Sequence, residues 1–262
     1  MKIATWNINS IRLRAGLLQN LVNDAAPDII CLQETKCPNE YIPLKEIHKL
    51  GYEHNYFHGE KGYNGVALIS KIPLKDIETN IYGKRPHTRH ISGTMPDGTR
   101  LHNFYVPAGR DIPDPLINEH FAHKLDYLED MISYFDTFKD SEKHIIVGDF
   151  NVAPFEHDVW SHKQMEKVIS HTPVETEKLF RMYKNHGWID VSRHFVPQEE
   201  KLYSWWSYRN QDWKKSNRGR RLDHIWVTSP LKNNLVGQQI LREARDWERP
   251  SDHVPVVAEL AF

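Results

Sequence analysis

The sequence has little cysteine, almost no net charge and no long hydrophobic run. Its 262 residues include only Cys31 and Cys37, which excludes a disulfide scaffold and favours reduced thiols. The formal net charge is −1, so the molecule as a whole does not attract polyanions, and any surface for nucleic acid must be local. No apolar run is long enough to cross a membrane, and no apolar leader precedes the first strand-like segment. These absences predict a cytoplasmic protein with no membrane partner.

The residues that are present suffice for a large hydrophobic core. Hydrophobic residues make up 39% of the chain, including 8 Trp, 11 Tyr and 10 Phe, and the 26% of charged residues argue against disorder. Sandwiches and barrels of this length often form one domain, and neither a linker nor a repeat is recognisable. We therefore expect residues 1–262 to form a single domain.

The spacing of apolar residues predicts alternating strands and helices. A long amphipathic helix is expected over residues 115–138, a helix over 13–22 that Ser10 could cap, and a hairpin around Asp97. Shorter helices are expected at 43–50 and 179–186, and strands at 2–7, 28–33, 52–58, 66–70, 74–81, 90–95, 100–106, 144–147, 221–227 and 256–260. This order predicts an α/β fold in which two mixed sheets pack face to face with helices outside.

The segment HIIVGDFNVAP at residues 144–154 is the most informative of the expected strand ends. Gly148 ends a β-branched run, which places Asp149 and Asn151 at the carboxyl end of the strand, where sheet proteins place their chemistry. The acid could activate a water molecule and the amide could hold an anion. By itself the pattern favours a strand followed by a turn, because Asp and Asn are common turn residues.

Polar residues at other expected strand ends favour a chemical role over a turn. They are Asn7, Glu34, Tyr105, Asp223, Asp252 and His253. Together with Asp149 and Asn151 they offer mainly oxygen donors, without the Cys and His spacing of a zinc site, which suits Mg²⁺ or Mn²⁺ and a phosphate ester as substrate. Asp252, next in sequence to His253, could orient the imidazole and raise its pKa. Each of these residues taken singly is more often structural than catalytic.

Two basic clusters could provide a local surface for nucleic acid. The first contains Lys84, Arg85, His87, Arg89 and His90, and the second contains Arg209, Lys214, Lys215, Arg218, Arg220 and Arg221. Charge runs are usually solvated loops. The second cluster differs because Trp205, Trp206, Tyr208 and Trp213 lie within or beside it, and aromatic rings combined with cations stack on bases and bind phosphates.

The chain resembles bacterial exonuclease III through many short motifs that occur in the same order. They are WNINSIR (6–12), LQETK (32–36), GYNGVAL (62–68), YVP (105–107), GDFN (148–151), SWW (204–206), RRLDHIW (220–226) and SDHVPV (251–256). The resemblance spans the whole chain. It implies the four-layered α/β sandwich of the DNase I-like phosphodiesterases, endonuclease activity at abasic sites, and a monomer, against which we see no heptad repeat or spare apolar stripe.

The same resemblance implies roles for the polar residues at the strand ends. Glu34 with Asn7 would hold Mg²⁺, for which Mn²⁺ could substitute, and Asp149 would orient or deprotonate the attacking water. Asn151 and His253 would bind the scissile phosphate, Tyr105 would contact it, Asp252 would hold His253, and Asp223 would support the network. Members of the family differ in whether a second metal lies near Asp149, Asn151, Asp252 and His253.

The expected DNA contacts include two departures from the family. A polar residue usually follows YVP, whereas this chain has Ala108, so that Arg110 is expected to contact phosphate instead. Trp205 and Leu222 would line the pocket for the abasic sugar, and Arg220 stands where a bulky apolar residue is common. Lys214, Lys215 and Arg218 would bind the DNA backbone.

The expected function is that of a DNA-repair phosphodiesterase. Its substrate would be double-stranded DNA with abasic sites or blocked 3′ ends, cut 5′ to the lesion, with 3′-5′ exonuclease trimming. One alternative is a phosphodiesterase of the same fold acting on a small molecule or lipid, although such substrates need no Trp-rich basic segment. The other is a non-catalytic RNA-binding regulator, although such proteins can lose catalytic groups that are all present here.

Overall fold

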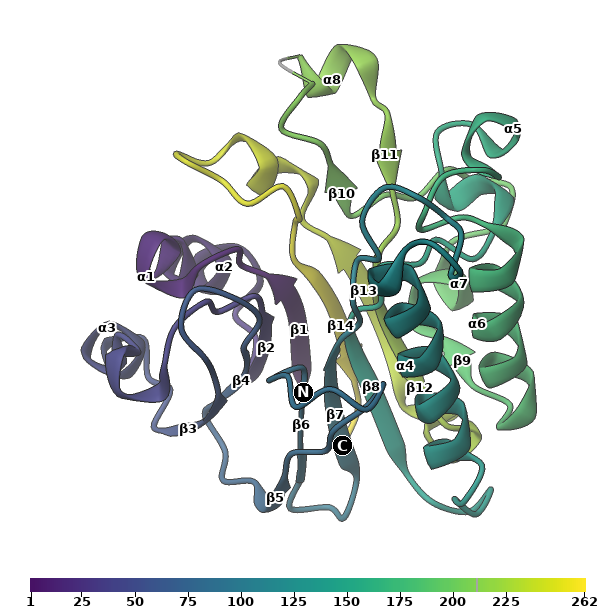
Figure 1. Cartoon of the computed structure of the whole chain (residues 1–262). Helices are drawn as coiled ribbons and strands as arrows, with labels where there is room; N and C mark the ends of the chain where they lie inside the picture. The colour runs from purple at the N-terminus through teal and green to yellow at the C-terminus, as the bar shows by residue number, and fades with distance from the viewer. Residues whose placement is uncertain (211) are drawn as a thin grey trace.

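Two six-stranded mixed sheets form the centre of the computed structural model, which describes residues 1–210 and 212–262 (Figure 1). The first sheet contains β1 (Lys2–Asn7), β2 (Ile29–Gln33), β3 (His54–His58), β4 (Val66–Ser70), β13 (Leu235–Ile240) and β14 (Val256–Leu260). The second contains β5 (Lys75–Glu78), β6 (His90–Thr94), β7 (Arg100–Tyr105), β8 (His144–Asp149), β9 (Ile189–Asp190) and β12 (Asp223–Val227). Their strand orders are β13-β14-β1-β2-β4-β3 and β5-β6-β7-β8-β12-β9.

Helices cover the outer face of each sheet, as Figure 1 shows. On the first sheet these are α1 (Ile11–Arg14), α2 (Leu17–Ala25) and α3 (Leu44–Lys49), and on the second α4 (Glu119–Phe135) and α6 (Pro173–Asn185). The remaining helices are α5 (His162–Met165), α7 (Val191–Phe195), α8 (Trp213–Ser216) and the 3₁₀ segments η1 (Asn39–Tyr41), η2 (Glu156–Asp158), η3 (Ser229–Asn234) and η4 (Arg242–Asp246). The predicted four-layered sandwich is therefore confirmed.

The alternation of side chains along each strand explains the layers. In β8, Ile145 and Val147 belong to the core between the sheets, whereas Ile146 belongs to the core beneath α4 and α6. Successive strand residues point to opposite faces, so a run that is apolar at every position is buried on both sides. β1 behaves likewise, since Ile3 lies between the sheets and Ala4 lies under the first group of helices.

The expected elements are mostly present, and their ends differ from prediction for local reasons. The helix expected at 13–22 is two helices, and Ser10, at φ 85°, makes no side-chain cap. The long helix begins only at Glu119, because the Asn118 side chain accepts the amides of His120 and Phe121. The helix expected at 179–186 begins at Pro173, behind a capping box of Thr172 and Glu175.

Parallel pairing brings two pairs of strand ends to one edge of the sandwich. β1 runs parallel to β2, and β7 runs parallel to β8. The carboxyl ends of these strands therefore carry Asn7, Glu34, Tyr105 and Asp149 to the same edge. Antiparallel β12 places its first residue, Asp223, directly opposite Asp149.

Close backbone approach at this edge requires a glycine in β8. Gly148 has φ 140°, and a Cβ there would lie 1.9 Å from the carbonyl oxygen of Phe104 on the neighbouring strand. Any larger residue would push β7 and β8 apart. The glycine that precedes Asp149 therefore fixes where the acid stands relative to Tyr105.

A small ribbon stands above this edge of the sandwich (Figure 1). It is made by β10 (Trp205–Trp206) and β11 (Gly219–Arg220), which pair antiparallel, with α8 at its tip. The ribbon contains most of the second basic cluster. Among the described residues, both cysteines are free and buried, and no helix has the length and apolar character to span a membrane.

Candidate active site

The centre of the strand-end cluster is an amide shared by two carboxylates. Asn7 Nδ2 donates to Glu34 Oε1 at 3.0 Å and to Asp149 Oδ2 at 2.9 Å. The oxygen of Asn7 instead accepts the backbone amide of Asn9 at 3.1 Å. In this structure Asn7 thus bridges the two acids through its amide nitrogen, and its role beside the metal stays a prediction.

Glu34 is held on both of its oxygens. The Tyr105 hydroxyl donates to Oε1 at 2.6 Å, and the Lys36 ammonium lies 2.7 Å from Oε2. Burial alone would raise the pKa of Glu34, but the charge of Lys36 and the hydrogen bonds from Asn7, Lys36 and Tyr105 outweigh it and lower the pKa. Glu34 is therefore a carboxylate at neutral pH.

Asp149 is an acid in an environment that disfavours its charge. It is 1% exposed, and burial raises its pKa to about 7, although the charge of His253 opposes this shift. Negative charge on Asp223 and Glu34 adds to the increase. A carboxyl group with a pKa near neutrality can accept a proton during catalysis and return it afterwards.

His253 is held by Asp223, not by its neighbour in sequence. The Nδ1–H of His253 donates to Asp223 Oδ2 at 2.8 Å, and Nε2 lies 3.7 Å from Asp149 Oδ2. Burial alone would lower the pKa of His253, but the charges of Asp223 and Asp149 outweigh it and raise the pKa to about 10. The ring is thus an imidazolium between two carboxylates.

Asp252 points away from the imidazole, so the prediction that it orients His253 is wrong. Its Oδ2 accepts the indole N–H of Trp205 at 2.9 Å, and its Oδ1 accepts the Asn9 amide at 3.2 Å. Adjacent residues in an extended segment present their side chains to opposite sides. Asp252 therefore positions Trp205, and it acts on the histidine only through its charge, which is the smallest of the named contributions that raise the pKa of His253.

Asn151 lies beside Asp149 in a left-handed backbone conformation. Its φ is 51°, its backbone amide donates to Asp149 Oδ1 at 2.9 Å, and its Nδ2 donates to the Val106 carbonyl at 2.9 Å. Glu34 also has positive φ, at 52°. Such conformations are costly for residues other than glycine and concentrate at functional sites, where the surrounding structure imposes them.

The donors at this site fit a divalent metal ion on the side of Glu34 and Asp149. Within residues 1–210 and 212–262, the one group of three His, Cys, Asp or Glu donors within 4.8 Å of one another is Asp149, Asp223 and His253. A metal bound to His253 would have to displace a ring proton that the charges of Asp223 and Asp149 hold. A cation near Glu34 and Asp149 would instead relieve the repulsion that raises the pKa of Asp149. Asp252 faces Trp205 and Asn9 instead of this group, and the second metal position near Asp149 and His253 stays a prediction.

Trp205 and Trp206 differ sharply in burial. Trp206 is 1% exposed and packs on Trp213 in the core, whereas Trp205 is half-buried beside Leu222. The guanidinium of Arg220 lies 4.9 Å from the centre of the Trp205 ring and donates to Ser170 Oγ at 2.9 Å. Trp205 thus lies beside both Leu222 and Arg220, and Arg220 is anchored to Ser170, whereas the pocket for an abasic sugar stays a prediction.

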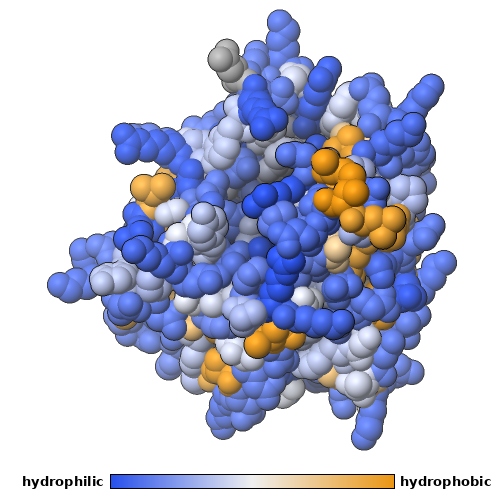
Figure 2. All heavy atoms as spheres, in the orientation of Figure 1, coloured by the Kyte–Doolittle hydropathy of each residue, from blue (hydrophilic) through white to orange (hydrophobic). Residues whose placement is uncertain are grey.

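The remaining basic residues differ in exposure and in how far other side chains already occupy their charges. Lys214 pairs with Asp246 at 2.6 Å, so its charge is already partly neutralised. Lys215 and Arg110 are exposed, and Arg218 lies over the Trp160 ring, 4.6 Å from its centre. The face seen in Figure 2 is mainly hydrophilic, with small groups of hydrophobic residues.

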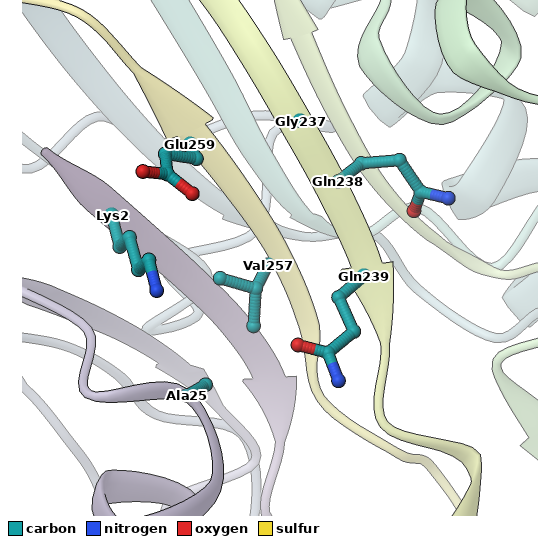
Figure 3. A pocket seen from close by; sticks show the side chains of 7 residues that line it. All are labelled: Lys2, Ala25, Gly237, Gln238, Gln239, Val257 and Glu259. Carbon is teal, nitrogen blue, oxygen red and sulfur yellow. The ribbon is translucent and has the colours of Figure 1, made fainter.

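Two cavities differ in their relation to this cluster. One of about 440 Å³ adjoins it, because it is lined by Tyr105 and Ala108 together with Arg85, Arg89 and Arg110. The other, of about 130 Å³, lies over β1, β14 and β13 and is lined by Lys2, Glu259 and small or amide residues (Figure 3). The first cavity brings arginine side chains next to the catalytic cluster. The second cavity is lined by no residue of that cluster.

Sequence reasoning missed several residues of the site. Lys36 was visible as a polar strand-end residue, but its pairing with Glu34 was not. Ser204, whose hydroxyl donates to Asp223 at 2.6 Å, and Asn9 belong to motifs that carried the resemblance, which was the only available signal. Lys124, on α4, had no signal at all.

Comparisons with known proteins agree with this geometry. Residues 4–253 match the endonuclease/exonuclease/phosphatase family. Exodeoxyribonuclease III of Haemophilus influenzae is 30% identical over 99% of both chains, and DNA repair nuclease APEX1 of Danio rerio is 31% identical over 100% of this chain and 82% of its own. Among solved structures, an AP endonuclease from Archaeoglobus fulgidus has a TM-score of 0.91 and 32% identity. The 3′ phosphatase NExo from Neisseria, bound to product DNA hairpin, has 0.91 and 30%. Both comparisons cover 100% of each chain.

Proposed function

The chain belongs to the endonuclease/exonuclease/phosphatase family as an exonuclease III-like AP endonuclease, and we propose that it cleaves DNA 5′ to abasic sites and trims blocked 3′ ends with Mg²⁺. The observation that carries this proposal is the convergence of Glu34, Asp149 and the Asp223–His253 pair at one edge of the sandwich. The names of the relatives support DNA as the substrate, and a 3′ phosphatase among them supports action on 3′ ends. We further propose that the protein acts as a monomer.

The metal would be held by Glu34 and Asp149 and would supply positive charge against the phosphate oxygens. Mn²⁺, which accepts the same oxygen ligands, should substitute for Mg²⁺. Lys36 and Tyr105 hold Glu34 in place, and Asn7 fixes the spacing of the two acids. These contacts orient the carboxylates before substrate arrives.

Different residues accept the proton of the water and stabilise the negative charge on the phosphate. Asp149, a buried carboxylate at the centre of the cluster, accepts a proton from the attacking water. The imidazolium of His253, held by Asp223, donates a hydrogen bond to the phosphate as negative charge accumulates. We assign to the same phosphate Asn151, which lies beside Asp149, and Tyr105, which donates to Glu34.

A nicking assay tests this proposal directly. A duplex oligonucleotide with one abasic site should be cut 5′ to the site in Mg²⁺, and EDTA should abolish the cut. An intact duplex with a 3′ phosphate measures end trimming in the same series. If neither product appears in Mg²⁺ and neither appears in Mn²⁺, the proposed activity is refuted.

Glu34→Gln should weaken the response to the metal. Replacing the carboxylate by a neutral amide removes one unit of charge from the proposed ligand set, so the Mg²⁺ concentration for half-maximal activity should rise about tenfold or more. The measurement is a Mg²⁺ titration of nicking at saturating DNA. Lys36→Met is the informative partner, because freeing Glu34 Oε2 should lower that concentration. An unchanged titration in Glu34→Gln would place the metal elsewhere.

Trp205→Ala should separate the two activities. An abasic nucleotide turns out of the helix at low cost, and a tight pocket then excludes nucleotides that retain a base. Losing the Trp205 surface should lower abasic cleavage roughly tenfold more than end trimming, by analogy with stacking losses, with little salt dependence. Arg220→Ala should instead weaken binding that recovers at low salt. Equal loss of both activities together with a lower Tm would assign Trp205 to the core.

A further inference from the structure

A buried cation that takes no part in the chemistry described so far lies behind the site. Lys124 projects from α4, and its side chain is 0% exposed. Its ammonium forms an ion pair with Glu175, donates to the backbone carbonyl of Asn151 at 2.8 Å, and approaches that of Ala108 at 3.4 Å. These contacts join α4 and α6 to the loops that follow β7 and β8.

The surroundings of Lys124 require it to be charged. All three partners are acceptors, and only the protonated amine offers three N–H donors. Glu175 is itself fixed, because it accepts the backbone amides of Ser170 and Thr172 and the Thr172 hydroxyl. The pair is therefore fully hydrogen-bonded, as a buried ion pair must be to be tolerated.

The carbonyl that Lys124 holds belongs to a residue whose backbone is constrained. Asn151 adopts φ 51°, and its side chain reaches Asp149 and the Val106 carbonyl. A left-handed asparagine is costly unless its neighbours fix both peptide groups. The amide of Asn151 is fixed by Asp149 and its carbonyl by Lys124.

We propose that Lys124, fixed by Glu175, is a positioning residue that sets the direction of the Asn151 side chain towards the scissile phosphate. This inference rests on the proposed function, because Asn151 is assigned to the phosphate only there. Lys124 touches no reacting atom and acts through the Asn151 carbonyl. Lys124 also approaches the Ala108 carbonyl, so it supports the loop in which Ala108 stands where the family usually has a polar residue.

The test removes both charges together so that neither is left buried alone. In Lys124→Met/Glu175→Gln, kcat for abasic cleavage should fall about tenfold to a hundredfold with KM within about threefold, since small displacements of a binding group cost that much. Lys124→Arg keeps donors for both partners and should restore most of kcat. Arg100→Met is the matched control. Arg100 is another largely buried cation, paired with Glu78 at 2.6 Å, at the far end of β7, roughly 17 Å from Tyr105 at ~3.3 Å per residue. It should lose stability without losing kcat.

A double-mutant cycle distinguishes positioning from general support of the fold. In an Asn151→Ala background, the Lys124 changes should lower kcat by less than about twofold further, because the residue they act through is gone. A second readout needs no activity. With ¹⁵N-labelled asparagine, the Asn151 side-chain amide signals should shift in the double variant, whereas those of Asn103, buried on β7, should not. If the double variant fails to fold, the same cycle and spectrum apply to Glu175→Gln alone, which keeps Lys124 but removes the charge that fixes it.

Two results would overturn the inference. One is a multiplicative loss in the Asn151→Ala background, and the other is an unmoved Asn151 amide. Failure of the proposed function looks different, because the wild-type chain itself would then leave abasic DNA uncut. In that case the Asn151 amide would still respond to Lys124, but its link to phosphate binding would be lost.

Discussion

Asp149→Asn should lower kcat for abasic cleavage by about a thousandfold while KM changes by less than about threefold. The carboxyl group accepts the proton of the attacking water, and an amide cannot, so the loss falls on the transition state and not on substrate binding. Asp149 is also one of the two proposed metal ligands. The loss in kcat should therefore lie in the upper part of the range for removal of a single proton acceptor. The measurement is single-turnover and steady-state cleavage of an abasic duplex at saturating Mg²⁺.

The fold should survive this substitution. Burial and neighbouring acids raise the pKa of Asp149 to about 7, which means that its charged form is disfavoured where it stands. A neutral amide of the same size should therefore leave Tm unchanged or slightly higher. Asp97→Asn, in the exposed hairpin turn between β6 and β7, is the control and should retain full activity. Near-normal turnover in Asp149→Asn, or a large fall in Tm, would contradict the proposed role.

The sequence predicted the layers of this protein because they depend on local patterns. β2 and β8 are mostly apolar runs, and such runs must be buried on both faces. It failed at β13, where Leu235–Ile240 contains Gly237, Gln238 and Gln239 and reads as a loop. This strand lies at the edge of the first sheet, so only one side of its backbone is paired and its side chains need not be apolar.

The sequence predicted which residues form the site, but it did not predict their contacts with one another. Parallel strands bring their carboxyl ends together within each sheet, which places Glu34 beside Asn7 and Tyr105 beside Asp149, and the packing of the two sheets then joins the two pairs. Which acid holds His253 depends on register between β12 and β8, which apolar spacing does not specify. Lys124 illustrates the same limit, since a lysine on an amphipathic helix is ordinarily solvated, and only the packing of α4 against α6 buries it.

Asp223→Asn and Asp252→Asn should differ by orders of magnitude, although the sequence favoured Asp252 as the partner of His253. Asp223 accepts the imidazole N–H at 2.8 Å and is completely buried. Removing its charge should lower kcat about a hundredfold to ten-thousandfold, the range seen when the acid that orients a catalytic histidine is neutralised. Asp252 contacts Trp205 and Asn9 instead, so Asp252→Asn should cost less than about fivefold in kcat.

The pH dependence identifies the cause of that difference. Burial lowers the pKa of His253, and the charges of Asp223 and Asp149 outweigh it, so the imidazolium persists at neutral pH and is lost as the pH rises through about 10. In Asp223→Asn the largest opposing charge is gone while burial remains, and the alkaline limb of kcat should move down by roughly one to three pH units. Asp252→Asn removes only the smallest of the named contributions, so its limb should stay in place. Profiles of kcat from pH 6 to 10 at saturating Mg²⁺ decide the matter, because a limb that has moved down falls inside this range whereas the limb of the wild type and of Asp252→Asn only begins at its upper end. Equal losses and equal shifts in the two variants would mean that both acids charge the histidine, and that the 2.8 Å contact with Asp223 is not what holds it in the active form.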